Sequence, residues 1–238
     1  MKFRKYALHL SILIILLFSI TAISAADLND TSSMDSDVLK DNSPGAMSFM
    51  ALESDMELQN KTFEMQQDYK FNNNSDLLYV EGINVTNNNY VINGNNHVID
   101  CGNQARAFNI TGKDVMINNL IIQNGYYTFG SAIKSTTSLT LNNVTFINCS
   151  GNGTVNVGAV FSNSGKLTVN NCKFIDNAGQ EGASISAFYS NVDISTSTFI
   201  SSSEKIIKGH IYILDSTLNM KNCDFLNTTS KYSTEIFS

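Results

Sequence analysis

Aspartates in the repetitive part of this chain are the first candidates for catalysis. They are Asp100, Asp114, Asp176, Asp193, Asp215 and Asp224. Hydrolysis of a glycosidic bond needs two carboxyl groups on either side of that bond, and calcium-dependent lysis needs several carboxylate oxygens on the metal. When the repeats described below are aligned, Asp176, Asp193 and Asp224 fall at three different repeat positions. We therefore predict no enzyme activity and no cofactor, with these acids exposed to solvent.

Histidine and cysteine form no recognisable catalytic or metal-binding motif. His97 and His210 lie in distant repeats, and the chain has no zinc-type spacing. Cys172 and Cys223 share one repeat position but lie two repeats apart. At ~4.8 Å per stacked strand their Cα atoms would be roughly 10 Å apart, whereas a disulfide needs less than about 7 Å. We predict that the cysteines are buried free thiols.

The charge of the chain argues against nucleic acid as a partner. There are 15 Lys and Arg residues and 21 Asp and Glu residues. Residues 1–26 contain three of the basic residues and none of the acidic ones, so the chain without them has a net charge of −9. Arg106 is then the only arginine. Binding to phosphate groups needs clustered positive charge, which this chain lacks.

A repeat of 24 to 28 residues dominates the sequence from residue 115 onward. Five segments align without gaps, and their first residues are Val115, Leu139, Leu167, Val192 and Leu218. If the first residue is position 0, positions 0 and 2 are apolar, and so in most repeats are positions 5 and 7. Each pair has the two-residue period of a strand with one buried face, and the change of phase between positions 2 and 5 predicts a turn.

Two columns of identical residues are expected to stack from one repeat to the next. Position 4 is asparagine in four repeats, which suits a sharp turn and predicts a hydrogen-bonded ladder. These residues are Asn119, Asn143, Asn171 and Asn222. Position 7 is phenylalanine in four repeats and predicts an aromatic stack inside the core. These residues are Phe146, Phe174, Phe199 and Phe225.

Further strands that begin with glycine lie between these units, as in GSAIKS from Gly130 and GAVFSN from Gly158. Each repeat therefore supplies three short strands and three turns. A leucine-rich repeat has a similar length, but it needs a helix or a leucine consensus that is absent here. We predict an all-β fold, a right-handed parallel β-helix of about six coils, because a single repeat cannot bury its own apolar face.

The first residues have the order of a signal peptide. Positive charge at Lys2 and Lys5 precedes an apolar run at 10–23 and small residues up to Ala26. The run is shorter than the ~20 residues that a membrane-spanning helix needs. We expect cleavage after Ala26, export to the cell surface or medium, and membrane contact only through the signal peptide.

The remaining chain divides by composition. Residues 27–57 are predicted to be an acidic flexible leader, and residues 58–114 an N-terminal cap with the first coil. Residues 115–238 are predicted to be the β-helix repeats, ending without a clear cap.

The cap coil reads INGNNHVID at 92–100 and ARAFNI at 105–110. These strings, with later units such as NVTFIN at 143–148, resemble archaeal (methanogen) adhesin-like proteins with right-handed parallel β-helix repeats. The resemblance covers residues 58–238. It implies display at the cell surface and adhesion, and it brings no catalytic residue. Such proteins are usually longer, so the resemblance also suggests a short or truncated member.

Asn-x-Ser/Thr sequences are frequent, and we expect possible glycosylation at Asn84, Asn152 and Asn227. Asn143 is expected to be too buried for modification.

Three functions remain open: a surface adhesion or structural protein, a polysaccharide lyase or hydrolase, and a remnant of a longer surface protein. In the first case the partners would be glycans or surface proteins of other cells, with the loops 150–157 and 178–181 as contacts.

Overall fold

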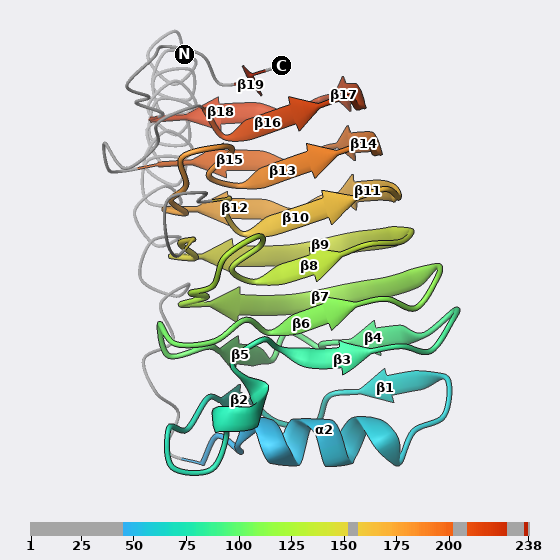
Figure 1. Cartoon of the computed structure of the whole chain (residues 1–238), viewed down its shortest axis with the longest axis vertical. Helices are drawn as coiled ribbons and strands as arrows, with labels where there is room; N and C mark the ends of the chain where they lie inside the picture. Colours follow the sequence, from blue (N-terminus) through green and yellow to red (C-terminus); the bar gives the residue numbers. More distant parts are fainter. Residues whose placement is uncertain (1–44, 152–156, 202–208, 228–235, 238) are drawn as a thin grey trace, which may run out of the picture. The chain divides into compact units, whose positions relative to one another are not determined.

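The computed structural model describes residues 45–151, 157–201, 209–227 and 236–237, which all belong to one compact unit, Gly45–Ser238. Parallel strands stack there into a β-solenoid of about six turns (Figure 1). The predicted all-β, parallel β-helix fold is confirmed. The predicted signal peptide, residues 1–26, lies outside the described residues.

The strands form three rows, which we call the first, second and third row. The first row contains β1 (Thr62–Glu64), β4 (Val91–Asn93), the first half of β7 (Val115–Gln123), the first half of β9 (Leu139–Ile147), β11 (Lys166–Asn170), β14 (Asn191–Ser195) and β17 (Thr217–Lys221). The second row contains β2 (Tyr69–Lys70), β5 (Val98–Asp100), the second halves of β7 and β9, β12 (Lys173–Ile175), β15 (Thr198–Ile200) and β18 (Asp224–Leu226). The third row contains β3 (Ile83–Val85), β6 (Phe108–Ile110), β8 (Ile133–Ser135), β10 (Val160–Asn163), β13 (Ile185–Phe188), β16 (Ile211–Leu214) and β19 (Ile236–Phe237).

The sequence predicts three short strands per coil, and the structure differs in two coils. There the strands of the first and second rows run together as β7 and β9, each nine residues long. The chain still turns within them, because Asn119 and Asn143 have φ values of 50° and 53°. The two rows therefore form one sheet that is continuous around this corner.

Pairing between neighbouring coils follows the alignment of the repeats. In β7 and β9, Val115 pairs with Leu139 and Ile117 pairs with Leu141, which are positions 0 and 2. These side chains are buried, and the position between them is exposed or half-buried. The two-residue period thus points one face of each strand into the core.

Position 4 adopts the left-handed backbone region in all five repeats. Asparagine adopts these backbone angles more readily than most residues, because its side chain is short and polar. In the repeat that lacks asparagine, Thr196 has φ 50°. The corner is therefore imposed by the stacked coils even where the residue type does not favour it.

The four phenylalanines of position 7 form a stack inside the core. Neighbouring ring centroids are 4.9, 4.9 and 4.8 Å apart, and the interplanar angles are at most 13°. Phe146, Phe174 and Phe199 are fully buried, whereas Phe225 in the last described coil is half-buried. The stack follows from the coil spacing, which places each ring directly over its equivalent.

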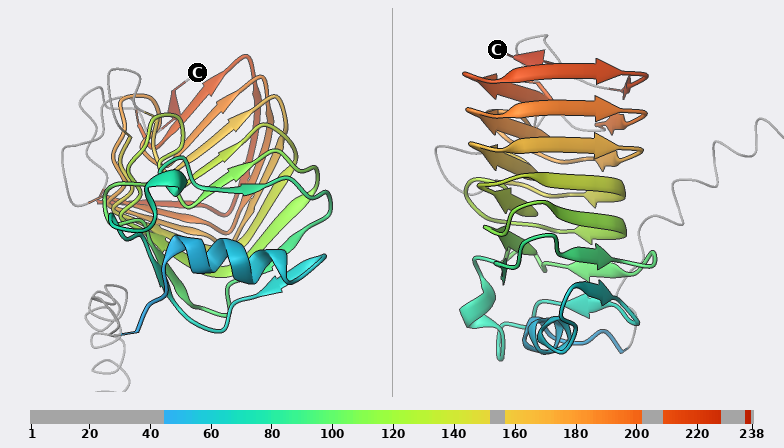
Figure 2. Two further views of the ribbon diagram at one scale, coloured as in Figure 1. Left: turned by 60° about the horizontal axis from the view of Figure 1, so that its bottom comes forward. Right: turned by 90° about the vertical axis from the view of Figure 1, so that its right-hand side faces the viewer.

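A helix, α2 (Phe49–Glu57), covers the N-terminal end of the stack (Figure 2). Phe49, Leu52 and Met56 are buried and belong to the same core cluster as the coils. The sequence predicts a flexible leader over residues 27–57, and this prediction is wrong for the helix. The cap begins earlier than residue 58, because three apolar residues at helical spacing pack on the first coil.

Asp76 holds the start of this helix. Its buried carboxylate accepts hydrogen bonds from the backbone N–H groups of Phe49 (2.9 Å) and Met50 (3.2 Å). Asp76 precedes a short 3₁₀ helix, η1 (Leu77–Tyr79). Free N–H groups at a helix N-terminus are well satisfied by a carboxylate, so this residue ties the cap to the first coil.

We expect the substitution Phe174→Ala to cost about 3–5 kcal/mol of unfolding free energy, since it removes a fully buried ring between two others. Phe225→Ala is the matched control and should cost less, because Phe225 is half-buried and stacks on one neighbour among the described residues. Urea denaturation followed by far-UV circular dichroism measures both. An equal or larger loss for Phe225→Ala would contradict the described core.

Candidate functional site

The predicted asparagine ladder forms over three coils, and we call it the corner ladder. The side-chain Nδ2 of Asn143 donates to Oδ1 of Asn119 (2.8 Å), and Nδ2 of Asn171 donates to Oδ1 of Asn143 (3.3 Å). Thr196 occupies the next coil, so the ladder does not reach Asn222. All four asparagines are exposed. The expectation that Asn143 is too buried for modification is therefore wrong.

A longer ladder runs along the first row, one residue before the corner, and we call it the strand ladder. Each side chain donates to its equivalent in the preceding coil at 2.8–2.9 Å. Its members are Ser195, Asn170, Asn142, Asn118 and Asn93. The last amide, that of Asn93, donates to the carboxylate of Glu64 on β1. Sequence reasoning missed this ladder, although position 3 shows the same run of asparagines.

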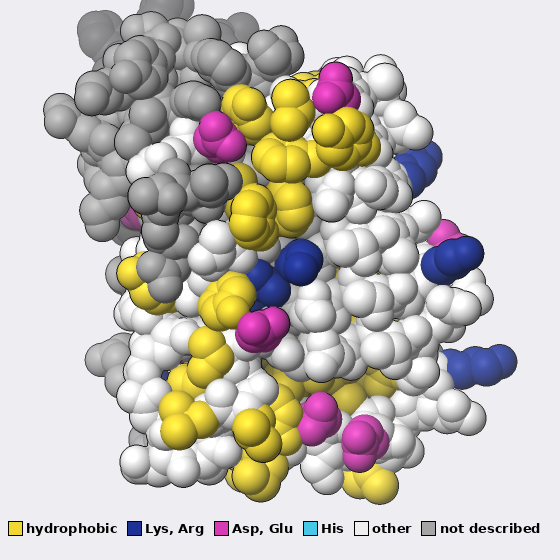
Figure 3. All heavy atoms as spheres, viewed as in Figure 1, with side chains coloured by type: hydrophobic (Ala, Val, Ile, Leu, Met, Phe, Trp, Pro, Cys, Tyr) yellow, Lys and Arg dark blue, Asp and Glu magenta, His cyan; other side chains and the backbone are white. Residues whose placement is uncertain are grey.

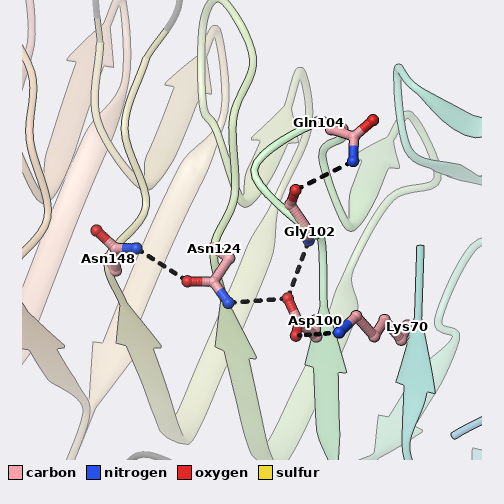
Figure 4. Close-up of polar contacts among 6 residues, drawn as sticks. All are labelled: Lys70, Asp100, Gly102, Gln104, Asn124 and Asn148. Atoms are coloured by element: carbon pink, nitrogen blue, oxygen red, sulfur yellow. Dashed lines mark hydrogen bonds and ion pairs between the residues drawn. The ribbon is translucent and has the colours of Figure 1, made fainter. Parts of the chain in front are cut away.

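A third ladder lies beyond the end of the second row, and Figure 4 shows it. Asn148 donates to Asn124 (2.9 Å), and Asn124 donates to Oδ1 of Asp100 (2.9 Å). Asp100 also accepts from the backbone N–H of Gly102 (2.9 Å) and lies 3.8 Å from Nζ of Lys70. This carboxylate, the first catalytic candidate in the chain, is thus the acceptor that ends a ladder.

Asp193 has a comparable role on β14. Its carboxylate accepts a hydrogen bond from Nδ2 of Asn219 in the next coil (3.0 Å), and Nζ of Lys166 lies 3.0 Å away. The hydrogen bond from Asn219, together with Lys166, lowers the pKa of Asp193. Within the described ranges, no three His, Cys, Asp or Glu side chains come together as a metal site requires. Asp100 and Asp193 are placed to hold neighbouring coils together.

Arg106 is buried and fixed by backbone carbonyl groups. Its guanidinium donates to the carbonyl oxygens of Gly130 (2.6 Å), Thr128 (2.5 Å) and Phe129 (3.0 Å), and its Cζ lies 4.6 Å from the ring centroid of Tyr127. Burial lowers the pKa of Arg106 to about 10, so it remains charged at neutral pH. This arginine orders the loop between β7 and β8.

His210 lies inside the core at the start of β16. Its Nδ1 forms a hydrogen bond of 2.9 Å with Oγ of Ser184, and its ring lies beside Phe199 and Phe225. Nε2 of His210 has no hydrogen-bond partner in the described part of the chain. Burial lowers the pKa of His210 to about 4, so the ring is neutral in the folded protein.

The cysteines are free, as predicted. Cys101, Cys149 and Cys172 are buried, and Cys223 is half-buried rather than buried. Burial raises the pKa of Cys149 to about 12 and that of Cys172 to about 11. Such thiols stay protonated and act as small apolar side chains rather than as nucleophiles.

Two of the predicted glycosylation sites lie on the described surface. Asn84 on β3 and Asn227 after β18 are both exposed, whereas Asn152 lies outside the described residues. Oδ1 of Asn84 accepts a hydrogen bond from Nδ2 of Asn109 (2.8 Å). Of the two predicted contact loops, 150–157 is largely outside the described residues, and 178–181 is partly buried.

The outward face of the third row carries a line of aromatic rings over β10, β13 and β16. Ring centroids are 5.3 Å apart between Phe129 and Phe161, 5.0 Å between Phe161 and Phe188, and 6.0 Å between Phe188 and Tyr212. Figure 3 shows hydrophobic side chains gathered over these strands. Sequence reasoning missed this outer aromatic row, because its members fall at two different positions of the strands. We call this line of rings the apolar strip; Phe129, Phe188 and Tyr212 are half-buried in it, and Phe161 is buried.

The chain matches no protein-family model, no curated protein and no solved structure. Among the described residues, no helix is long and apolar enough to cross a membrane.

We expect unfolding free energy to fall as the pH is lowered from about 6.5 to about 4. In this window the unfolded chain binds a proton at residue 210 that the folded protein, with a histidine pKa of about 4, does not bind. The contribution is up to about 3 kcal/mol, from ~1.4 kcal/mol per pKa unit. Urea denaturation at pH 7 and pH 4.5 measures the loss.

The variant His210→Gln should lose less unfolding free energy than the unsubstituted protein over the same pH range. His97→Gln is the control, since it removes the other described histidine and should leave the loss in place. Equal pH dependence of His210→Gln and the unsubstituted protein would show that His210 is not buried in its neutral form.

Proposed function

We propose that this chain is an exported cell-surface protein whose β-solenoid has a binding or structural role at the cell envelope. The observation that carries the proposal is the set of polar ladders, which hold neighbouring coils together over a long surface. Such a surface is rigid and repetitive, and it keeps its shape without a partner. The order of residues 1–26 supports export, and the resemblance to archaeal adhesin-like β-helix proteins supports adhesion.

Two alternatives belong to other classes. A polysaccharide lyase or hydrolase would need carboxylates that converge on one outward site, whereas Asp100 and Asp193 each bind a side chain of the next coil. A remnant of a longer surface protein would fold in the same way but bind nothing. Degradation of polysaccharides by the purified protein would favour the enzyme.

Export is tested first at the N-terminus. We expect the exported protein to begin at Asp27, because Ser24 and Ala26 are the small residues that a signal peptidase needs. N-terminal sequencing measures the cleavage point, and antibodies applied to intact and to permeabilised cells measure the location. Ala26→Leu should block cleavage, and Ala46→Leu is the control. A protein that keeps Met1 and is labelled only in permeabilised cells would contradict the proposal.

We expect glycan occupancy of an exposed asparagine to be higher where its side-chain Nδ2 makes no hydrogen bond. Nδ2 of Asn109, Asn143 and Asn148 donates in side-chain hydrogen bonds, whereas Asn84 uses Oδ1 and keeps Nδ2 available. We therefore expect glycan on Asn84 in preference to these three. Peptide mass spectrometry of protein exported by a glycosylating host measures occupancy at each site, and higher occupancy at Asn143 than at Asn84 would contradict the expectation.

A further inference from the structure

A shallow hollow lies at the corner where the third row passes into the first row, in the last described coils. Its volume is about 420 Å³. Residues from two successive corners line it: Tyr189, Ser190, Asn191, Asp215, Ser216 and Thr217. The first three run from the end of β13 to the first residue of β14, and the last three run from the end of β16 to the first residue of β17. The pairing of Phe188 with Leu214 and of Asn191 with Thr217 places these corners directly over each other.

Tyr189 is an unusual residue for this corner. Its φ is 50°, in the left-handed region that a bulky side chain rarely adopts, and its side chain is 61% exposed. The preceding coil has the small residues Ser164 and Gly165 at this corner. Neither backbone preference nor burial explains an aromatic ring here. The equivalent residues Ser164 and Asp215 also have positive φ values of 61° and 46°, so the stacked coils impose this backbone and leave the choice of an exposed ring unexplained.

Two polar groups accompany the ring. Asp215 is exposed at the equivalent corner of the next coil, with φ 46°, and its carboxylate binds no side chain in the described part of the chain. Oδ1 of Asn191 accepts a hydrogen bond from Thr217 (2.8 Å), which leaves its Nδ2 to donate outward. The hollow thus offers an aromatic face, a pair of strong acceptors and an amide donor.

This combination fits a sugar better than the other ligand classes. A single carboxylate cannot supply the six or more oxygen ligands that calcium takes. Its negative charge disfavours phosphate, sulfate and other anions. A pyranose ring has an apolar face that packs on an aromatic ring and hydroxyl groups that donate to carboxylates and accept from amides. Phe188 of the apolar strip immediately precedes Tyr189 in the chain, although it does not itself line the hollow.

We propose that the hollow binds a neutral saccharide, with one sugar unit stacked on Tyr189 and its hydroxyl groups hydrogen-bonded to Asp215 and Asn191. This inference rests on the proposed surface role, and it gives that role a ligand class and a location. Further sugar units extend from the hollow along the apolar strip toward Phe188.

The test is binding of the purified protein to an array of neutral, sialylated and sulfated oligosaccharides, followed by titration calorimetry with the best neutral oligosaccharide. Tyr189→Ala and Asp215→Asn should each weaken that binding at least tenfold, and Tyr189→Phe should keep it. Tyr126→Ala and Asp114→Asn are the controls. Asp114 is exposed with φ 57° at the same corner several coils away, so its substitution should leave binding unchanged.

Far-UV circular dichroism verifies that each variant is folded. The proposal is overturned if no neutral oligosaccharide is bound, if only charged ones or a protein partner are bound, or if the Tyr189 and Asp215 variants bind as tightly as the controls. A protein found at the cell surface that binds no sugar overturns this inference alone. A sugar-binding protein found only inside cells overturns the proposed export instead.

Discussion

Parallel pairing of each coil with the one before it is the constraint on which the rest of the structure depends. The backbone hydrogen bonds fix the register, so every side chain lies over its equivalent in the neighbouring coil. A column of identical residues is therefore favourable only if that residue type packs well against itself. Phenylalanine does so through ring stacking, and asparagine does so because it is both donor and acceptor. A column of aspartates would repel itself, which explains why the described carboxylates do not stack on one another.

The ladders have a common direction, and it explains where the acids are. Every hydrogen bond within the corner, strand and third ladders runs from a side chain to its equivalent in the coil on the N-terminal side. The corner ladder ends at Asn119, whereas in the strand ladder and the third ladder the last asparagine donates to a carboxylate, which accepts without needing to donate. Glu64 and Asp100 occupy these places. Charge-assisted hydrogen bonds are stronger than those between neutral groups, so the ladder ends are well held. Glu64 and Asp100 thus link the ends of these two ladders to the neighbouring chain.

The hollow lies at a corner whose polar side chains are not part of the three asparagine ladders. Tyr189 and Asp215 share a corner column with Ser164, and among the described residues this column forms no side-chain ladder. The cap shows the opposite case. Asp76 and Arg106 are buried polar residues without equivalents in the repeats, and each is hydrogen-bonded to several backbone groups. Their burial is tolerated because the helix end and the loop carbonyls replace water as partners.

The repeat by itself determined the solenoid, the inward columns and the free cysteines, because a period near 25 with fixed apolar positions leaves only stacking to bury the apolar face. It also indicated the corner at position 4. The sequence did not indicate the helical cap. Phe49, Leu52 and Met56 lie in an acidic segment, and the surface on which they pack exists only once the first coil has formed. The ending of the ladders on Glu64 and Asp100, and the meeting of Tyr189 with Asp215 in one hollow, were decided by tertiary structure alone. These residues are 24 to 29 positions apart or lie outside the aligned columns, and only the register of stacked coils brings them together.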